Sequence, residues 1–301
     1  MGARFIGTSS LKPALRTHVP KRMRKPASFA GGSMLPNDDR PAFEFVGDWR
    51  GQVIATAIHN GHDVRPEVAA ELVLPDPDRL REEDPHTDEI GALIPSRVVV
   101  HRSRFEVDLN RKREAAVYRR PEEAWGLHIL RDPPLDEDLV TASLDIYDAF
   151  YAELGRHLDA VAERGRFVVF DIHSYNHRRD GADATEAPGE GNPELNVGTG
   201  SLDRRRFGPV VDAFIASLLC MRTSAGPLDV RENVRFRGGH LAAWTHARYP
   251  DRGIVLALEF KKTFMDEWSG EFDGARVGEL ARALAGTVPS VEETLREVAM
   301  R

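Results

Sequence analysis

One apolar run near the middle of the chain, Phe167–Phe170, constrains the fold more than any other feature of the sequence. It contains two phenylalanines and two β-branched valines with no polar residue between them, a pattern typical of a strand that is buried on both faces. A second run, Gly253–Phe260, has the same character and is interrupted only by Glu259. Strands of this kind occur where helices cover both sides of a sheet. The two runs therefore predict an α/β fold.

The segments around these runs alternate between strand and helix patterns, as expected for a three-layer α/β sheet. A long helix is predicted over Asp136–Arg164, because apolar residues recur there at helical spacing and Gly165 follows as a stop signal. The other predicted elements are strands at Gln52–Ile58, Arg97–His101 and Phe105–Leu109 and helices at Pro66–Leu74, Pro85–Ile94, Phe207–Met221 and Ala275–Met300, with Pro289 as a candidate break. Gly, Asp, Glu and Pro between Arg179 and Asp203 predict a long mobile loop beside the site.

Residues 1–40 differ in composition from the rest of the 301-residue chain. They hold eight Lys or Arg and two Asp, with Pro, Gly and Ser between them, and are predicted to form a disordered basic extension. The formal net charge of the whole chain is −7, so the remaining residues carry about −13. Such a charge does not favour nucleic-acid binding. Residues 41–301 are expected to form a single α/β domain.

Cys220 is the only cysteine, which excludes a disulfide framework and a cysteine zinc cluster. Because it lies in the apolar run Val210–Met221, we expect it to be buried. No run approaches the roughly 18 apolar residues of a membrane span. The N-terminus lacks the apolar core of a secretory signal. We therefore expect a cytoplasmic protein that does not bind membranes.

Histidines follow two of the predicted strands. His59 and His62 come directly after Gln52–Ile58, and His173 follows the first apolar run. In open α/β sheets, ligands bind beyond the carboxyl ends of the strands. Two histidines on one turn and a third from another strand end would hold one zinc ion and leave a fourth position for water. The alternative is that they are ordinary surface histidines.

Carboxylates and arginines supply the other candidates. A carboxylate such as Glu259 is costly to bury within an apolar strand unless it has a partner or a task, which suggests a general base; a strand-end glutamate that reaches solvent is the alternative. Asp84 ends an acidic run that is more typical of a solvated surface, but it could ligate a metal or orient a histidine. Asn110 and Arg111 suit a carboxylate ligand. The residues alone favour the alternative, an ordinary surface ion pair of Arg111 with Asp108 or Glu114.

The order of these motifs resembles the N-formylglutamate amidohydrolase family, a relative of the zinc carboxypeptidases and the aspartoacylases, over roughly Phe43–Asp273. The motifs that carry the resemblance are His59-Asn60-Gly61, Glu83-Asp84 with Thr87-Asp88, Ser103-Arg104, Val107–Arg111, Asp171–Ser174, Leu195–Gly200, Gly238-Gly239-His240, Leu256–Glu259 and Phe264–Glu267. The resemblance implies a phosphorylase/hydrolase-like fold with a three-layer mixed sheet. It also implies a zinc-dependent amidohydrolase.

In such an enzyme, His59 and His173 would be zinc ligands and Glu259 the general base. The Asn110-Arg111 pair would bind the substrate carboxylate, and a second carboxylate could be held by Arg104, Arg178 or Arg179. Zinc carboxypeptidases carry His-x-x-Glu, and this chain has His62 in place of the glutamate. His62 is therefore expected as the third ligand, with Asp84 as its rival.

The implied reaction is hydrolysis of the amide of a small anionic N-acyl amino acid, with N-formyl-L-glutamate giving formate and glutamate. Two alternatives remain open at this point. One is a carboxypeptidase-like metallopeptidase with a larger substrate and an open cleft. The other is a non-catalytic protein that kept the fold and binds a metal or a ligand.

Overall fold

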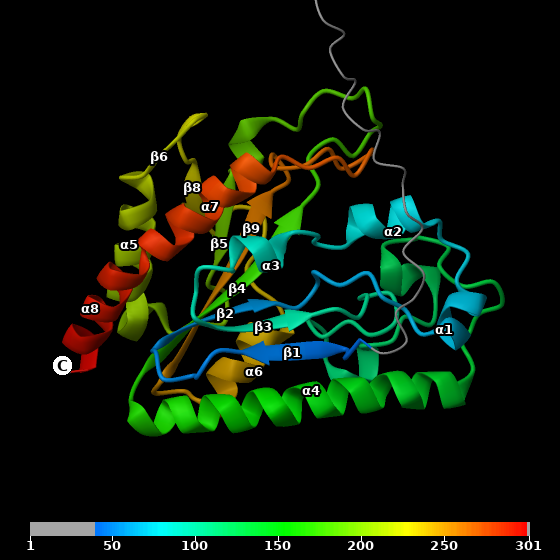
Figure 1. The fold of residues 1–301 in the computed structure, drawn as a ribbon, viewed down its shortest axis with the longest axis horizontal. Coiled ribbons are helices and arrows are strands. Elements are labelled where there is room, and N and C mark those ends of the chain that lie inside the picture. Colours follow the sequence, from blue (N-terminus) through cyan, green and yellow to red (C-terminus); the bar gives the residue numbers. More distant parts are fainter. Residues whose placement is uncertain (1–39, 300–301) are drawn as a thin grey trace, which may run out of the picture. The chain divides into compact units, whose positions relative to one another are not determined.

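The computed structural model describes residues 40–299, and Figure 1 shows how their elements are arranged. The predicted extension lies outside this range except for Arg40, so the division of the chain into an extension and one domain stays a prediction. The centre of the fold is a seven-stranded sheet with the strand order β1-β3-β2-β4-β9-β5-β8. The strands are Phe43–Val46 (β1), Val53–Ala57 (β2), Ser96–Val100 (β3), Phe167–Tyr175 (β4), Leu195–Gly198 (β5), Val230–Glu232 (β8) and Gly253–Lys261 (β9).

The sheet is mixed. Its four central strands, β3, β2, β4 and β9, are parallel. At one edge β1 is antiparallel to β3, and at the other β5 is antiparallel to β9 and parallel to β8. A separate two-stranded ribbon is formed by Arg222–Thr223 (β6) and Gly226–Pro227 (β7). The mixed sheet confirms the α/β fold class that the sequence predicts.

The two apolar runs form the centre of the sheet. β4 is buried along its whole length and pairs with β9 over its whole length. Val168, Phe170 and Ile172 belong to the core on one face, whereas Phe167 and Val169 belong to the core on the other. The prediction of strands buried on both faces is confirmed.

Helices cover both faces of the sheet (Figure 1). One face carries α4 (Glu137–Arg164) and α6 (His240–Arg248). The other carries α3 (Thr87–Ile90), α5 (Arg204–Leu219), α7 (Gly274–Gly286) and α8 (Val288–Ala299). Two short helices, α1 (Pro66–Glu71) and α2 (Asp76–Glu82), lie in the segment between β2 and β3. Single 3-10 turns occur at Arg113–Ala115, Pro121–Ala124 and Gly189–Gly191.

The long helix α4 agrees with its prediction at both ends. The Asp136 side chain accepts a hydrogen bond from the backbone N–H of Asp138, which caps the helix. Gly165 ends it with a φ of 148°, a value that favours glycine. Phe150 and Leu154 are buried between this helix and the sheet. Within residues 40–299, no helix is both long and apolar enough to cross a membrane.

The segment Phe105–Leu109 is not the strand that the sequence predicts. It begins within a turn in which the N–H groups of Glu106 and Val107 both donate to the carbonyl of Ser103. Its alternating apolar side chains are buried, but in loop segments that pack over the helices and the sheet. In this segment the alternation of apolar residues therefore correctly indicates which side chains are buried, but it does not indicate a strand.

The predicted loop Arg179–Asp203 is also partly wrong, because it contains β5. This strand lies between β8 and β9 and pairs with both. Its short sequence, with Asn196 and Gly198, carries weak local strand signals. Strand formation here depends on neighbours that are distant in the sequence. β1 and β8 also pair with strands that are distant in the sequence and have no counterpart among the predicted elements. The helices α2 and α6 were not predicted either.

Two smaller predictions have opposite outcomes. Cys220 is exposed, so the prediction that it is buried is wrong. It follows the end of α5, whose buried face is formed by residues such as Val211, Phe214 and Leu218. The predicted break at Pro289 is confirmed, since α7 and α8 are separate helices and Pro289 lies in the first turn of α8, where its missing N–H costs little.

Candidate active site

The candidate site lies at the carboxyl ends of β2 and β4. His59 is in the turn directly after β2, and Asp84 is in the loop between α2 and α3. His173 lies within β4 and not beyond its end as predicted, because β4 continues to pair with β9 as far as Tyr175. The strand ends thus bring together residues that are more than one hundred positions apart.

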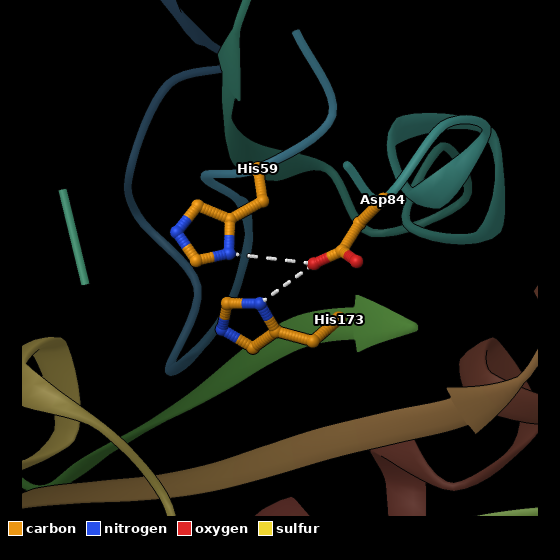
Figure 2. Close-up of side chains that lie close together, drawn as sticks. All are labelled: His59, Asp84 and His173. Atoms are coloured by element: carbon orange, nitrogen blue, oxygen red, sulfur yellow. Dashed lines mark hydrogen bonds and ion pairs between the residues drawn. The ribbon is translucent and has the colours of Figure 1, made fainter. Parts of the chain in front are cut away.

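His59, Asp84 and His173 form a buried cluster (Figure 2). The Oδ2 atom of Asp84 is 3.0 Å from Nδ1 of His173 and 3.4 Å from Nδ1 of His59. One ligand atom from each residue lies within 4.8 Å of the others. Two imidazole nitrogens and one carboxylate oxygen are a donor set that suits zinc and similar divalent metals.

Each imidazole also faces a buried carboxylate on its other side. Nε2 of His59 is 2.7 Å from Oδ1 of Asp108, and Nε2 of His173 is 3.1 Å from Oδ2 of Asp171. Metal-binding histidines are commonly oriented by such carboxylates through the ring nitrogen that does not bind the metal. The Nδ1 atoms are therefore the ones turned towards Asp84, and the cluster fits a bound metal ion.

Asp84 is held by several polar contacts. Ser174 donates its hydroxyl to Oδ1 of Asp84 at 3.2 Å, and the hydroxyl of Thr87 donates to the Asp84 carbonyl at 2.7 Å. Burial would raise the pKa of Asp84, but hydrogen bonds from His173 and His59 outweigh it and hold the pKa well below its usual range. The carboxylate is thus kept ionised, as a metal ligand must be.

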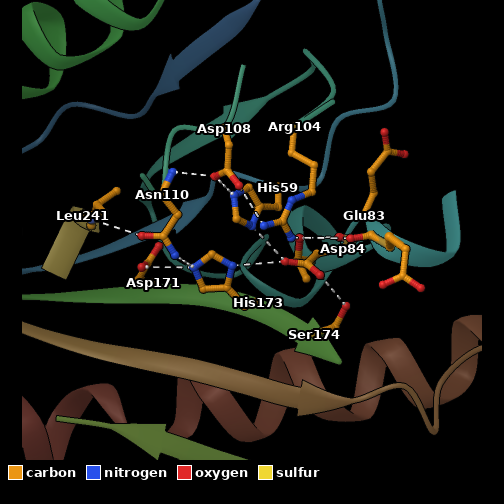
Figure 3. A network of polar contacts seen from close by, with 12 residues as sticks. His59, Glu83, Asp84, Arg104, Asp108, Asn110, Asp171, His173, Ser174 and Leu241 are labelled. Atoms are coloured by element: carbon orange, nitrogen blue, oxygen red, sulfur yellow. Dashed lines mark hydrogen bonds and ion pairs between the residues drawn. The ribbon is translucent and has the colours of Figure 1, made fainter. Parts of the chain in front are cut away.

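Asp108 lies between His59 and Arg104 (Figure 3). Its Oδ2 accepts a hydrogen bond from Arg104 at 2.8 Å and another from the hydroxyl of Tyr118. Burial would raise the pKa of Asp108, yet the charge of Arg104 and the contact with His59 hold it well below its usual range. Arg111 lies on the same carboxylate, with Nε 3.5 Å from Oδ2, and its guanidinium stacks over the Tyr118 ring.

Glu259 lies beside His173. The two residues occupy the same register position on the parallel strands β9 and β4, so their side chains project from the same face. Burial raises the pKa of Glu259 to about 7, and the charge of His173 opposes the shift. A carboxyl group with a pKa near neutrality is well suited to accept and donate a proton in catalysis.

A pocket of about 270 Å³ opens onto the cluster. The metal-ligand candidates and Glu259 form part of its wall, together with Asn110. The Nδ2 atom of Asn110 is 3.3 Å from Nε2 of His173, and its Oδ1 accepts a hydrogen bond from the N–H of Leu241 at the start of α6 (Figure 3). Positive charge lines the same pocket through Arg81, Arg104, Arg179, Arg237 and Lys262.

His62, which the sequence placed among the zinc ligands, lies outside the cluster. Its Nδ1 is 2.5 Å from Oε2 of Glu83, and its Nε2 is 3.0 Å from Nη2 of Arg79. Residues three apart converge when they share a helical turn, whereas the chain from Asn60 to His62 is not helical, and Asp63 then bridges to Arg102. The structure brings Asp84, the rival candidate, to the position next to His59 and His173.

The structure separates the other predicted substrate-binding residues into two groups. Asn110 and Arg104 line the pocket, as does Arg179. Arg178 instead pairs with Asp266 at 2.5 Å and lines a different cavity. Arg111 is not part of the pocket wall and pairs with Asp108, one of the two partners that the residues alone suggested for it.

Several residues of the site had no assigned role in the sequence. Asp171 shares a strand face with His173 because it lies two residues earlier, so its position could have been inferred from strand periodicity. Asp108 was expected only as an ion-pair partner of Arg111, and nothing in the neighbouring sequence placed it beside His59. Lys262 and Arg237 carry no local signal, since their place in the pocket depends on how distant segments pack.

Comparisons with known proteins agree with this fold. The sequence model of the N-formylglutamate amidohydrolase family matches residues 51–265. The crystal structure of N-formylglutamate amidohydrolase from Ralstonia eutropha JMP134 is similar to this chain with a TM-score of 0.66 and 17% identity, over 85% of this chain and 98% of that one. A gene product from Agrobacterium tumefaciens has a TM-score of 0.57 and 19% identity, over 83% and 96% of the two chains.

The structural likenesses support the fold alone, because both identities are low. Comparison with curated proteins gave no significant match. The family match is the stronger finding, since it spans well over half of the chain and includes His59, Asp84, His173 and Glu259. The chain belongs to the N-formylglutamate amidohydrolase family.

Proposed function

We propose that this protein is a zinc-dependent amidohydrolase that cleaves N-formyl-L-glutamate into formate and L-glutamate. The observation that carries the proposal is the buried convergence of His59, Asp84 and His173 next to Glu259, inside a small cationic pocket. One zinc ion would be held by the Nδ1 atoms of the two histidines and by the Asp84 carboxylate. When bound, such an ion polarises a substrate carbonyl and lowers the pKa of water towards 7.

The residues of the chain have distinct roles in this proposal. Asp108 accepts a hydrogen bond from the His59 imidazole, and Asp171 lies 3.1 Å from Nε2 of His173, so these two carboxylates orient the rings. Glu259 takes a proton from the attacking water, whose oxygen bonds to the acyl carbon. The carbon–nitrogen bond then breaks, and Glu259 delivers the proton to the leaving amine, so that formate and the free amino acid result.

The pocket suits a small anionic substrate. Its volume of about 270 Å³ is at the low end for ligand sites and matches one amino-acid derivative better than a peptide. Arg104, Arg179 and Arg237 line it, and a guanidinium can bind a carboxylate through two parallel hydrogen bonds. We propose that these arginines bind the two carboxylates of the substrate. Arg111 would instead form an ion pair with Asp108.

The proposal is tested by metal analysis combined with a panel of substrates. The purified protein is analysed for metals, depleted with a chelator and reloaded with zinc. Hydrolysis is then followed for N-formyl-L-glutamate, N-acetyl-L-glutamate, N-formyl-L-alanine and a dipeptide that ends in glutamate. We expect zinc-dependent release of formate, fastest with N-formyl-L-glutamate.

Two results would contradict the proposal. Preference for the dipeptide would favour the carboxypeptidase-like alternative. Absence of turnover on the whole panel, in protein shown to hold one zinc ion, would favour a protein that binds metal without this activity.

A further inference from the structure

We propose that Lys262 is a positioning residue that fixes the Glu83–Asp84 peptide and so keeps Asp84 in place as a metal ligand. The inference rests on the proposed function, because it takes His59, Asp84 and His173 as the metal site. Lys262 follows β9, three residues after Glu259, and belongs to the pocket wall.

The Lys262 ammonium makes two hydrogen bonds to the loop that carries Asp84. Its Nζ atom donates to the carbonyl of Glu83 at 2.7 Å and to the carbonyl of Arg81 at 2.6 Å. Arg81 lies in the last turn of α2, where helix carbonyls lack partners within the helix. The ammonium therefore caps the end of α2 and binds the first residues of the loop.

The Glu83 carbonyl and the Asp84 N–H belong to the same peptide group. While Lys262 holds the carbonyl, the Asp84 N–H donates to the carbonyl of His59 at 2.9 Å. This peptide group is thus held on one side by His59, a metal-ligand candidate, and on the other by Lys262, the residue that follows β9. Its orientation determines where the Asp84 carboxylate can reach.

The lysine itself is firmly placed. Its backbone N–H donates to the carbonyl of Tyr175, the last residue of β4, at 3.0 Å. Lys262 therefore ties the Asp84 loop to both β4 and β9, the strands of His173 and Glu259. A shift of the loop relative to these strands would move Asp84 away from both.

The burial of Lys262 indicates that its amino group is needed, and not only its hydrocarbon chain. Lys262 is 1% exposed, and burial of an ammonium is costly unless it is paired and hydrogen-bonded. Burial lowers the pKa of Lys262, and the neighbouring carboxylates of Asp84 and Glu82 oppose that shift. An apolar side chain would fill the same space without this cost but would leave the Arg81 and Glu83 carbonyls without their donor.

The test is a double-mutant cycle on metal affinity. The zinc affinity of the full chain is measured by competition with a chromophoric chelator for wild type, Lys262→Met, Asp84→Ala and the double variant. Lys261→Met is the matched control, because Lys261 is the preceding residue, makes no side-chain hydrogen bond to other residues within 40–299 and lies outside the pocket. Visible spectra of the cobalt-loaded proteins report the geometry of the metal site.

We expect Lys262→Met to weaken zinc binding by about 10- to 100-fold, the loss typical of residues that orient a ligand. Its cobalt spectrum should change, whereas Lys261→Met should match wild type in both measurements. In the Asp84→Ala background, Lys262→Met should cause no further loss. If Lys262→Met does not fold, Lys262→Gln, which keeps one N–H donor group, takes its place in the same cycle.

Two outcomes would overturn the inference: unchanged zinc affinity in the lysine variant, or the same loss with and without Asp84. In the second case Lys262 would affect metal binding independently of that carboxylate. A different result would show that the proposed metal site is wrong. In that case Asp84→Ala alone would bind zinc as well as wild type does.

Discussion

His173 and Glu259 lie side by side on neighbouring parallel strands, at the same register position of β4 and β9. One is a metal-ligand candidate and the other a carboxyl group whose pKa burial raises to about 7. Because the pairing of the two strands is continuous along their length, the distance between the two side chains is set by the sheet itself. Rigid strands position such groups more accurately than loops do.

Replacing Glu259 by glutamine should abolish most of the activity and leave the metal site intact. The amide keeps the size of the side chain but cannot accept a proton, and loss of a positioned base costs roughly 10²- to 10⁴-fold in rate. We expect kcat to fall by that factor while zinc content stays at the wild-type level. The exposed Glu297 on α8 provides the control, since Glu297→Gln should leave kcat unchanged. Wild-type turnover in the Glu259 variant would assign the base to another residue.

The same substitution should change how the stability of the metal-free protein depends on pH. The pKa of Glu259 is about 7 in the folded protein and 4.5 ordinarily, so the folded state binds more protons between these values. The contribution of Glu259 to the free energy of unfolding is therefore fully present below pH 4.5. It falls by roughly 3 kcal/mol in all as the pH rises through 7. Glu259→Gln should be the more stable protein at pH 8, and the difference should shrink at pH 5. Urea denaturation of chelator-treated protein at both pH values measures this, and a difference independent of pH would contradict the raised pKa.

Asp84 and His62 should differ sharply in their effect on metal binding. Asp84 lies against both histidines of the cluster, whereas His62 contacts Glu83 and Arg79. Asp84→Ala should therefore purify with little metal, as should His59→Ala and His173→Ala. His62→Ala should retain close to one equivalent. Metal content measured after dialysis against equimolar zinc decides between them, and a metal-free His62 variant would restore His62 as a ligand.

The carboxylates that face the Nε2 atoms of the two imidazoles should strengthen metal binding without being essential for it. Asp171 faces the ring of His173, and Asp108 faces the ring of His59. Conversion of either to asparagine keeps the shape but weakens the acceptor, and we expect a loss of about 10- to 100-fold in zinc affinity. Chelator competition measures the effect. A loss as large as that of Asp84→Ala would indicate direct coordination.

Arg179 and Arg237 should determine the preference for an acidic side chain in the substrate. Both line the pocket, and neither makes a side-chain hydrogen bond or ion pair with other residues in the range 40–299. Replacing both by alanine should raise KM for N-formyl-L-glutamate by about tenfold or more, the value of one lost charged contact. KM for N-formyl-L-alanine should change much less. Arg178→Ala is the control, because Arg178 is paired with Asp266 outside this pocket; equal effects on both substrates would refute the assignment.

Parts of the fold and site could be predicted because their signals are local. The apolar runs of β4 and β9 report burial on both faces, and the spacing of apolar residues in α4, with Asp136 and Gly165 at its ends, reports a helix. The positions of His59 and His173 near strand ends follow from the same patterns. β5 and β8 were missed because their pairing depends on distant strands and not on strong strand propensities of their own.

By itself, the sequence determined the sheet between two layers of helices, because hydrophobic periodicity can be read from neighbouring residues. It also singled out His59, His173 and Glu259 as candidates, because the histidines come near strand ends and Glu259 is a charge within an apolar strand. Only the tertiary structure shows that Asp84, and not His62, lies next to His59 and His173. His62 is three residues from His59 in the sequence, but its side chain contacts Glu83 instead. Asp84 reaches the histidines through a loop that Lys262 and His59 hold from opposite sides. Metal ligation depends on where side-chain atoms converge in space, and packing of distant segments sets that convergence.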